Sequence, residues 1–330
     1  MRAARSEGSC DWRPRAGRET LRLRAALKAE VRAFMDARGI LEVDTPHLAP
    51  HAVPDPELSC FSVTGRRARY WLVPSPEYHL KRLLAADYGD VYSLGPVFRD
   101  DEVGFLHEPE FTLLEYYRVG WDARALAEEA AGLVAHLTGR PNRVRFIRYV
   151  DLFQEALGLD PLTVPAEQLW KAIEPEHRPV GIEPDDRAAL CDFWLGTRFY
   201  PHLGERETVI VHDFPAEAAA LARLDPADPR FAQRFEMVIG GIEIANGYHE
   251  LADATEQALR FERDRAHRRR TGRTDVTIDP AFLAALRAGL PDCSGIAIGF
   301  DRVVLLAAGK EDLASTLAFP LAGYDLEACT

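Results

Sequence analysis

The sequence predicts an α+β fold in which an antiparallel sheet is flanked by helices. Residues 97–118 show two strand patterns joined by a charged loop, and from Glu110 onward the side chains alternate with the period of two that a strand requires. Residues 231–244 give a second pair of strands around two adjacent glycines. The phosphate-binding loops of parallel sheets, GxGxxG and GxxxxGK[ST], are both missing from the sequence. If the protein binds ATP, side chains rather than such a loop must hold the phosphates.

Helical patterns lie between the strand patterns. Residues 20–38 place apolar side chains at helical spacing, with Gly39 where a C-terminal cap belongs. Further helices are expected at residues 76–86, 122–139, 253–270, 279–289 and 302–308, and further strands at residues 60–64, 70–73, 144–150, 207–212 and 295–300. Residues 151–199 are expected to be helical, with several proline breaks and no identifiable chemistry. Residues 1–18 are expected to form a flexible tail, and residues 19–330 a single domain.

Composition restricts the class of protein. The chain has 330 residues, 47% of them hydrophobic, and a formal net charge of −12, which disfavours a broad nucleic-acid-binding surface. Its five cysteines are scattered and form no CxxC, so neither a disulfide framework nor a zinc site is indicated. We find no secretory signal and no membrane-spanning run. A cytoplasmic protein without a membrane partner is predicted.

The strand that starts at Glu110 carries an unusual acidic residue. Glu115 shares a strand face with Phe111, Leu113 and Tyr117, and a carboxylate on such a face is costly to bury unless a cation meets it. Either an internal arginine or water at the sheet end satisfies Glu115, or the site is a pocket for a ligand ammonium with Tyr117 beside it. Arg99 ends the preceding strand and could meet a phosphate in the same cleft.

The segment VFRDDEVGFLHEPEFTLLEYYR at residues 97–118 resembles motif 2 of the class II aminoacyl-tRNA synthetases, closest to the lysine-specific branch. GILEVDTP at residues 39–46 resembles motif 1, and GIAIGFDRVVLL at residues 295–306 resembles motif 3. Residues 71–84 and 235–251 also match that branch. Three motifs in order over nearly the whole chain are a strong signal. The resemblance implies the class II synthetase catalytic fold and a homodimer with motif 1 at its interface.

The resemblance also assigns residues to substrates. The amino-acid substrate is expected to contact Ser75, Pro76, Glu77, Glu115, Tyr117, Glu250 and Ala297. ATP is expected to contact Arg99, Asp100, Asp101, His107, Glu108, Glu243, Ile244, Gly299 and Arg302. Arg99 and Arg302 are the expected catalytic residues, because guanidinium groups grip phosphate oxygens with paired hydrogen bonds.

Other interpretations of several of these residues stay open. Glu243 and Glu250 are expected to hold Mg²⁺ beside the triphosphate, although an isolated pair of carboxylates is more often on the surface. Glu250 has a second expected role in binding the amino acid. Ser75 and Glu77 also suit the start of a helix without any ligand. Gly295 and Gly299 either let the backbone approach the nucleotide or serve tight packing.

The resemblance implies a reaction. A substrate carboxylate would attack the α-phosphorus of ATP and release pyrophosphate, and an acceptor would then attack the mixed anhydride. Fewer than twenty residues precede the first expected helix, so the anticodon-binding domain of lysyl-tRNA synthetases is expected to be absent. This architecture is similar to that of the short paralogues that attach lysine, preferably (R)-β-lysine, to a lysine side chain of elongation factor P. Ala297, where the tRNA ligases have glycine, agrees with that group.

Two alternatives to this function remain. One is an aminoacylating enzyme for tRNA, which is not the expected partner, or for another acceptor; the other is a non-catalytic paralogue with a regulatory role. Asp101 and Glu108 depart from the family pattern, which has glutamate and asparagine there, and both would affect ATP binding. A basic segment at residues 260–273 is either a solvated helix face or a docking surface for an acidic partner such as elongation factor P or tRNA.

Overall fold

An eight-stranded sheet organises the chain. The structure is a computed structural model that describes residues 12–100 and 103–321. The strand order is β1-β5-β6-β11-β10-β9-β8-β7. Their bounds are β1 Leu41–Glu42, β5 Val91–Phe98, β6 Glu110–Val119, β11 Cys293–Gly299, β10 Ile242–His249, β9 Phe231–Ile239, β8 Thr208–Pro215 and β7 Val144–Arg148. The predicted antiparallel sheet is correct from β5 to β8, whereas the edge pairs β1–β5 and β7–β8 are parallel.

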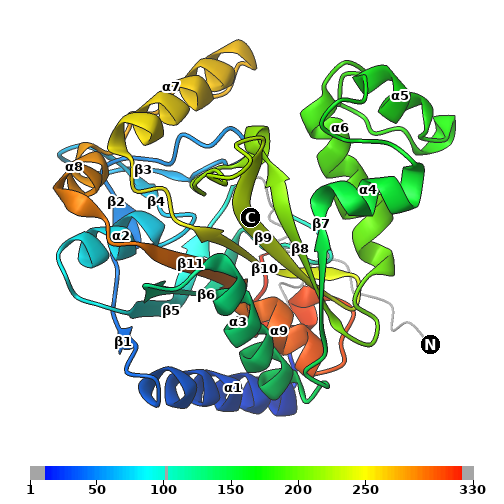
Figure 1. Cartoon of the computed structure of the whole chain (residues 1–330). Coiled ribbons are helices and arrows are strands. Elements are labelled where there is room, and N and C mark those ends of the chain that lie inside the picture. Colours follow the sequence, from blue (N-terminus) through cyan, green and yellow to red (C-terminus); the bar gives the residue numbers. More distant parts are fainter. Residues whose placement is uncertain (1–11, 101–102, 322–330) are drawn as a thin grey trace.

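Three helices cover one face of this sheet. They are α1 Arg18–Asp36, α3 Ala123–Thr138 and α9 Phe300–Ala307, and Figure 1 shows them below and in front of the strands. Asp122 caps α3 as its sequence position suggests, because its side chain accepts the backbone N–H of Ala125 at 2.7 Å. Apolar residues of the three helices form one continuous core with the inner strands. This packing leaves the opposite face of the sheet for the site.

The opposite face is bordered on one side by a smaller sheet and three helices. The small sheet has the order β2-β4-β3, with β2 Leu48–Ala49, β3 Ser62–Thr64 and β4 Arg69–Leu72. The helices are α2 Glu77–Ala85, α7 Ala254–Arg270 and α8 Pro280–Gly289. Tyr78 of α2 stacks on Phe282 of α8 with ring centroids 4.2 Å apart. This second core fixes α2 against the edge of the large sheet.

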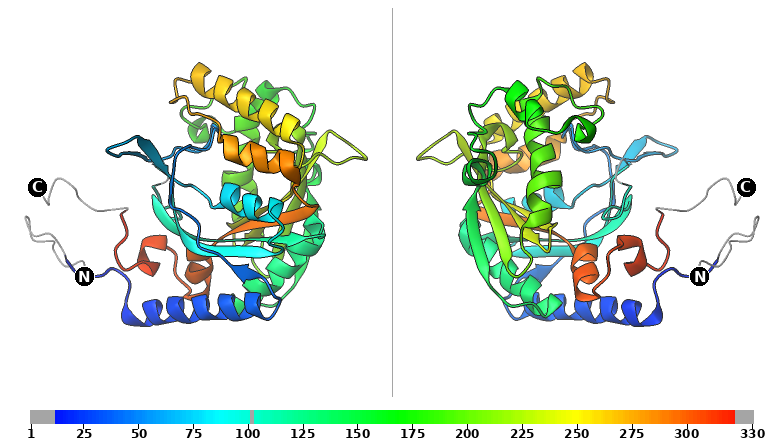
Figure 2. Two further views of the ribbon diagram at one scale, coloured as in Figure 1. Left: turned by 90° about the vertical axis from the view of Figure 1, so that its left-hand side faces the viewer. Right: turned by 90° about the vertical axis from the view of Figure 1, so that its right-hand side faces the viewer.

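A helical lobe borders the sheet on the other side. It contains α4 Tyr149–Leu157, α5 Ala166–Lys171 and α6 Arg187–Trp194, followed by a π-helical turn at Leu195–Phe199. Short 3-10 turns lie at Pro175–His177, Tyr200–His202, Ala216–Ala218 and Leu313–Thr316. The lobe has its own apolar cluster shared with β8, and it stands across from α7 in Figure 1. Figure 2 shows the same arrangement from both sides. The helical prediction for residues 151–199 is confirmed.

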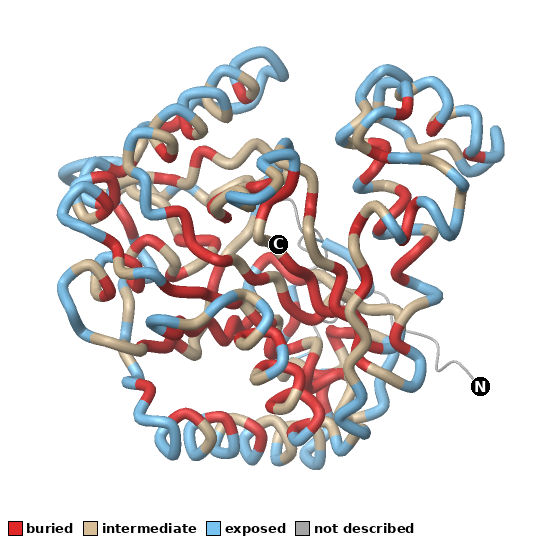
Figure 3. The backbone as a smooth tube through the Cα atoms, viewed as in Figure 1, coloured by how far each residue is buried: buried red, intermediate tan, exposed pale blue. Residues whose placement is uncertain are grey.

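The start of the described chain differs from the expected tail. The backbone N–H groups of Arg15 and Ala16 donate to the carbonyls of Ala318 and Leu317 at 2.8 and 3.1 Å. Ala16 is buried, and α1 already begins at Arg18. The prediction of a flexible tail is therefore wrong for residues 12–18, and residues 1–11 lie outside the described part. Figure 3 shows that burial is concentrated in the inner strands, whereas α7 and the outer turns of the lobe are mostly exposed.

Candidate active site

The strand register places four side chains in one row across neighbouring strands. Two of them were predicted from the sequence and two were not. Glu115 on β6 pairs with Ala297 on β11, and Ala297 pairs with Asn246 on β10. Asn246 in turn pairs with Glu236 on β9. Directly paired residues point to the same face of a sheet. The adjacent row on that face consists of Tyr117, Gly295, Tyr248 and Arg234.

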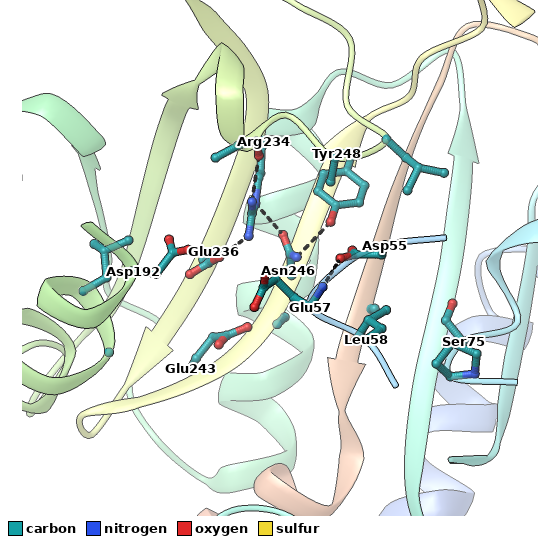
Figure 4. Close-up of a pocket in the computed structure, with 18 of the residues that line it drawn as sticks. Asp55, Glu57, Leu58, Ser75, Asp192, Arg234, Glu236, Glu243, Asn246 and Tyr248 are labelled. Carbon is teal, nitrogen blue, oxygen red and sulfur yellow. Dashed lines mark hydrogen bonds and ion pairs between the residues drawn. The ribbon is translucent and has the colours of Figure 1, made fainter. Parts of the chain in front are cut away.

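Both rows line a large cavity. Its volume is about 1120 Å³, and its walls come from the sheet, α2, α7 and the helical lobe. Figure 4 shows Glu236, Asn246 and Tyr248 projecting from neighbouring strands toward one space. The sheet therefore brings together residues that are more than 180 positions apart in sequence, from Glu115 to Ala297. The cavity has an acidic end and an end rich in arginine.

Glu115 occupies the acidic end. It is 2% exposed, and its carboxylate accepts hydrogen bonds from Ser75 Oγ at 2.7 Å and from the Tyr117 hydroxyl at 2.8 Å. Ser75 Oγ also accepts the backbone N–H of Glu77 at 3.0 Å. The interpretation of Ser75 as part of the helix start is therefore supported, and the same hydroxyl also contacts the buried acid. Its predicted contact with the amino-acid substrate stays a prediction. Within the described residues, no basic side chain forms an ion pair with Glu115.

A buried lysine lies behind this end of the cavity. Lys81 Nζ is 2.6 Å from Glu77 Oε1 and 2.5 Å from Glu250 Oε2, and the whole residue is 1% exposed. Glu250 Oε1 has no hydrogen-bond partner within the described residues. Sequence reasoning missed Lys81, although its position four residues after Glu77 on a helix was a usable signal.

The acidic end is short of positive charge. Glu77, Glu115 and Glu250 face one ammonium, so the cluster carries a formal charge of −2. Burial raises the pKa of Glu115 to about 8, and the Glu77 charge adds to this. Burial also raises the pKa of Glu250 to about 8 against the opposing effect of Lys81. Such carboxylates favour any ligand that brings cations.

Gly295 makes room for this cluster. A Cβ at Gly295 would lie 2.3 Å from Tyr117 Cε1 and 2.5 Å from Glu250 Oε1. No side chain fits there without moving both walls of the acidic end. At Gly299, by contrast, the nearest atoms to an added Cβ are at 3.5 Å or more, which is ordinary contact. The packing interpretation of Gly295 is therefore the one that the structure supports.

Arg302 and Arg99 line the other end of the same cavity. Arg302 Nη1 donates to the Glu243 carbonyl at 2.7 Å, and its Nη2 lies 3.0 Å from His107 Nε2. The Arg99 guanidinium stacks 5.0 Å from the centre of the Phe111 ring. Both arginines lower the pKa of Glu243, so both face the same space. The predicted pair of phosphate-facing arginines is therefore brought together.

Arg302 is positioned by the helix that carries it. The preceding residue, Asp301, is 2% exposed and accepts the backbone N–H of Thr112 at 2.8 Å. Arg24 of α1 forms an ion pair with Asp301 and donates to Thr112 Oγ1 at 2.6 Å. These contacts attach the start of α9 to β6, next to the row that contains Glu115.

The predicted magnesium pair has to be revised. Glu243 and Glu250 lie at opposite ends of β10, about 20 Å apart by the rise of a strand, so they cannot share one ion. Glu236 is the acid near Glu243: Glu243 pairs with Val238, so Glu236 is its diagonal neighbour on the same face. Burial raises the pKa of Glu243 to about 7, with Glu236 adding to the effect. Two adjacent carboxylates fit Mg²⁺ that is shared with phosphate oxygens.

Other polar side chains that sequence reasoning missed surround Glu236. Arg234 Nη2 donates to Glu236 Oε1 at 2.6 Å, and Tyr200 of the lobe donates to the other carboxylate oxygen. Arg234 Nε also donates to Asn246 Oδ1 at 3.3 Å (Figure 4). Asp192 of α6 lines the cavity, and burial raises its pKa to about 6. Asp192 is thus a residue of the 151–199 segment that sequence reasoning did not place in the site.

Several predicted ATP-binding and amino-acid-binding residues lie elsewhere. Pro76 occupies the N-cap position of α2 and is outside the cavity lining. Asp100 is exposed and lines a separate cavity of about 370 Å³, outside the main cavity, so its contact with ATP stays a prediction. Asp101 lies outside the described residues. Glu108 is 2% exposed, lines the main cavity and accepts the backbone N–H of Leu321 at 2.9 Å. Ile244, Gly299 and His107 line the cavity as expected.

Part of the basic segment of α7 is paired with acidic side chains nearby. Arg265 and Arg269 both pair with Asp275, which fits the solvated helix face. Arg268 does not belong to a surface, because it is 5% exposed and donates to the carbonyls of Asp55 and Leu58 at 2.8 and 2.9 Å. It thereby holds a loop that lines the main cavity. A docking surface that includes Arg268 is ruled out by this burial.

Comparison with known proteins identifies the family. The family model described as tRNA synthetases class II (D, K and N) matches residues 4–323. The chain belongs to the class II aminoacyl-tRNA synthetase family. The predicted resemblance and the predicted class II synthetase fold are therefore confirmed.

Curated relatives place the chain more narrowly within the class II synthetases. Proteins named elongation factor P–(R)-β-lysine ligase from Histophilus somni (strain 2336) and Pasteurella multocida (strain Pm70) are each 41% identical to it. The matches cover 93% and 94% of this chain, and 97% of each relative. The protein of that name from Vibrio cholerae is 40% identical over 94% of this chain and 98% of its own length. Among the described residues, no helix is long and apolar enough to cross a membrane.

Proposed function

We propose that this chain activates lysine or (R)-β-lysine with ATP and transfers it to a lysine side chain of elongation factor P. The names of the relatives, at 40–41% identity over nearly their full lengths, support this proposal. The function predicted from the motifs agrees with those names. The structure adds a physical reason for the amino-acid substrate.

The observation that carries the proposal is the uncompensated charge of the acidic end. Three carboxylates, Glu77, Glu115 and Glu250, face one lysine, which leaves two negative charges when all three carboxylates are ionised. Lysine and β-lysine each bring two ammonium groups and would neutralise both charges. An amino acid with a single ammonium would leave a buried carboxylate unpaired, which costs about 1–3 kcal/mol or more. The cavity therefore selects a dibasic substrate.

The substrate carboxylate would then lie toward the end of the cavity that Arg99 and Arg302 line. Attack of a carboxylate oxygen on the α-phosphorus forms the aminoacyl-adenylate and breaks the bond to the departing pyrophosphate. Arg99 would neutralise charge that develops on the α-phosphate, and Arg302 would grip the far end of the triphosphate. Acceleration comes from positioning and charge neutralisation, and no protein nucleophile is required.

Magnesium is part of the proposal, with Glu236 and Glu243 as the residues that would hold it. When bound, the ion neutralises phosphate charge between these carboxylates and ATP. The Arg234 and Tyr200 contacts to Glu236 fix the orientation of that carboxylate. Glu243 is held beside Arg302, whose Nη1 lies 4.0 Å from Glu243 Oε2.

The second step transfers the aminoacyl group. The neutral ε-amine of the acceptor lysine attacks the carbonyl carbon of the adenylate, an amide bond forms, and AMP leaves with the electron pair of the broken C–O bond. Ala297 lies beside Glu115 in the cavity wall, and its methyl group narrows the space near the substrate amines. This contact supports a role for Ala297 in choosing between α- and β-lysine, worth on the order of 1–3 kcal/mol.

The remaining expectations form part of the same proposal. Residues 19–330 act as one catalytic domain that dimerises through motif 1 in the cytoplasm. Leu41 on β1 and Leu48 on β2 are 49% and 44% exposed, which supports an interface on that side. Sedimentation of the purified protein would test the dimer.

The decisive experiment has two parts. Pyrophosphate exchange that depends on lysine or β-lysine tests adenylate formation, and the mass of elongation factor P after incubation with ATP and the amino acid tests transfer. We expect exchange with both amino acids and a mass increase of one lysyl group. Exchange without a mass increase would point to tRNA or another acceptor. If exchange is absent with every dibasic amino acid, the proposed activity is wrong.

A further inference from the structure

Lys81 is the one member of the acidic cluster that does not line the cavity. It sits behind the wall on α2, where its ammonium joins Glu77 of the same helix to Glu250 at the end of β10. The Phe282 ring of α8 covers it, with the ammonium 6.0 Å from the ring centre. Lys81 therefore affects a substrate in the cavity only indirectly, through Glu77 and Glu250, with which it forms ion pairs.

Among the described residues, Lys81 is the cation that offsets the negative charge of Glu115 and Glu250. Burial by itself lowers the pKa of Lys81, but Glu250 and Glu77 together raise it above its ordinary value, so it stays cationic. Tyr117 of β6 and Cys293 of β11 also face this region, and burial raises the pKa of each well above neutrality. Both are uncharged. Glu115 of β6 is the third carboxylate of the cluster, and Lys81 lowers its pKa at longer range.

We infer that Lys81 is a positioning residue that sets the charge of the amino-acid pocket to match a substrate with two ammonium groups. This inference deepens the proposed function and rests on it. With Lys81 present, its single ammonium group holds both Glu77 and Glu250, and the pocket lacks two positive charges. Without Lys81 the pocket lacks three, and a buried trianion is relieved by taking up protons. Protonated carboxylates bind ammonium groups poorly.

The physical signature of this role depends on pH. When folding raises the pKa of a carboxyl group, the free energy of unfolding of the ligand-free protein falls with rising pH. The fall occurs between the pKa of that group in the unfolded state and its pKa in the folded state. Because Lys81 lowers the pKa of Glu250, removing Lys81 raises the folded pKa of Glu250 further. The loss of stability and the weak binding of dications should then extend to higher pH, by about one unit. A lysine that only fills space would produce no such shift.

The test uses Lys81→Met, which keeps the length of the side chain, and Lys171→Met as its matched control. Lys171 also forms an ion pair with a glutamate four residues earlier, Glu167, at 2.7 Å, but both side chains are exposed. The double variant Lys81→Met/Glu250→Gln removes one charge of each sign. Urea unfolding between about pH 6 and 8.5 measures ligand-free stability. Calorimetry with 1,5-diaminopentane and with pentylamine measures the preference for a dication, and pyrophosphate exchange gives KM and kcat for the amino acid.

We expect Lys81→Met to lose stability more steeply with pH than the unaltered chain, and the double variant to recover most of that loss. A variant that folds at about pH 6 and not at about pH 8.5 is the extreme form of this result. The preference for diaminopentane should fall about tenfold at neutral pH, and KM should rise more than kcat falls. Lys171→Met should match the unaltered chain throughout.

Two outcomes would overturn the inference. One is a loss of stability in Lys81→Met that is the same at every pH and is not recovered by Glu250→Gln, because that pattern belongs to lost packing alone. The other is an unchanged preference for diaminopentane over pentylamine. Failure of the unaltered chain in pyrophosphate exchange, with the expected stability and diamine results, would instead reject the proposed activity and leave the role of Lys81 standing.

Discussion

The acidic end of the cavity and the basic face of α7 show opposite ways of carrying charge. The acidic end places Glu77, Glu115 and Glu250 against one cation. The α7 segment has many more charged residues, yet Arg265 and Arg269 are paired with Asp275 at the surface. Charge density in the sequence pointed to α7, whereas the buried carboxylates of the pocket outnumber the ammonium group that they face.

The difference follows from the cost of removing charge from water. An exposed ion pair contributes about 0–1 kcal/mol because water already solvates both partners. A buried carboxylate without a partner costs several times more, so it persists only where a ligand or a function compensates for it. We therefore regard an imbalance of buried charge as a better indicator of a site than a run of like charges.

The largest effect is expected from neutralising the pocket. In Glu115→Gln, KM for lysine or β-lysine should rise at least 100-fold, about 3 kcal/mol, because one ammonium loses its ionic partner. The ligand-free protein should be as stable as the unaltered chain or more so at pH 8, since burial favours the uncharged form of Glu115. Exchange kinetics and urea unfolding measure the two effects. If Glu115→Gln is less stable than the unaltered chain, the charge of Glu115 is already balanced in the ligand-free pocket. The pocket would then not differ from α7 in this respect.

The next effect tests the one buried member of the basic segment. Arg268→Ala should lower the free energy of unfolding by about 2–4 kcal/mol, because the carbonyls of Asp55 and Leu58 lose their donors. KM should rise as well, since that loop lines the cavity. Arg269→Ala, at a position whose side chain is 48% exposed, is the control and should change stability by less than about 0.5 kcal/mol. If Arg268→Ala and Arg269→Ala lower the free energy of unfolding equally, the buried and the exposed arginine of α7 do not differ in their contribution to stability.

The pH dependence of substrate binding gives a moderate effect. The pKa values of Glu115 and Glu250 are raised to about 8, so each binds a proton in the ligand-free pocket below that pH. Binding of a dication releases those protons. KM for the amino acid should therefore fall as the pH rises from about 6 to 8, by up to about tenfold per unit for each group. Glu115→Gln should reduce the slope by one proton, and a flat profile would contradict the assigned charges.

The smallest effect is expected on the exposed face of α7. Arg269→Glu should leave pyrophosphate exchange unchanged and alter the free energy of unfolding by less than about 0.5 kcal/mol. Modification of elongation factor P measured at low and high salt then tests the docking hypothesis separately. A salt-dependent rise in KM for the factor would assign this face to the partner, and no change would leave it as a solvated surface.

Local sequence patterns specified most of the helices and strands and several residues of the candidate site. Alternation at residues 110–118 predicted β6, and Asp122 and Asp279 mark helix starts where the structure has α3 and α8. The motifs also led to Arg99, Arg302 and Glu115, which line one cavity. These predictions succeeded because helix caps and side-chain alternation depend on residues within a few positions of one another.

Only the tertiary structure decided which charges are neighbours. The spacing of Glu243 and Glu250 suggested one metal site, but an extended strand carries them to opposite ends of the sheet, and Glu236 of the adjacent strand is the acid near Glu243. The inferred role of Lys81 likewise depends on Glu250, which is 169 residues away in the sequence. In the structure, Lys81 Nζ lies 2.5 Å from Glu250 Oε2. The sequence by itself determined the family, most of the elements and the candidate residues Arg99, Arg302 and Glu115. Cross-strand register and burial, which depend on long-range pairing, determined how those groups share charge.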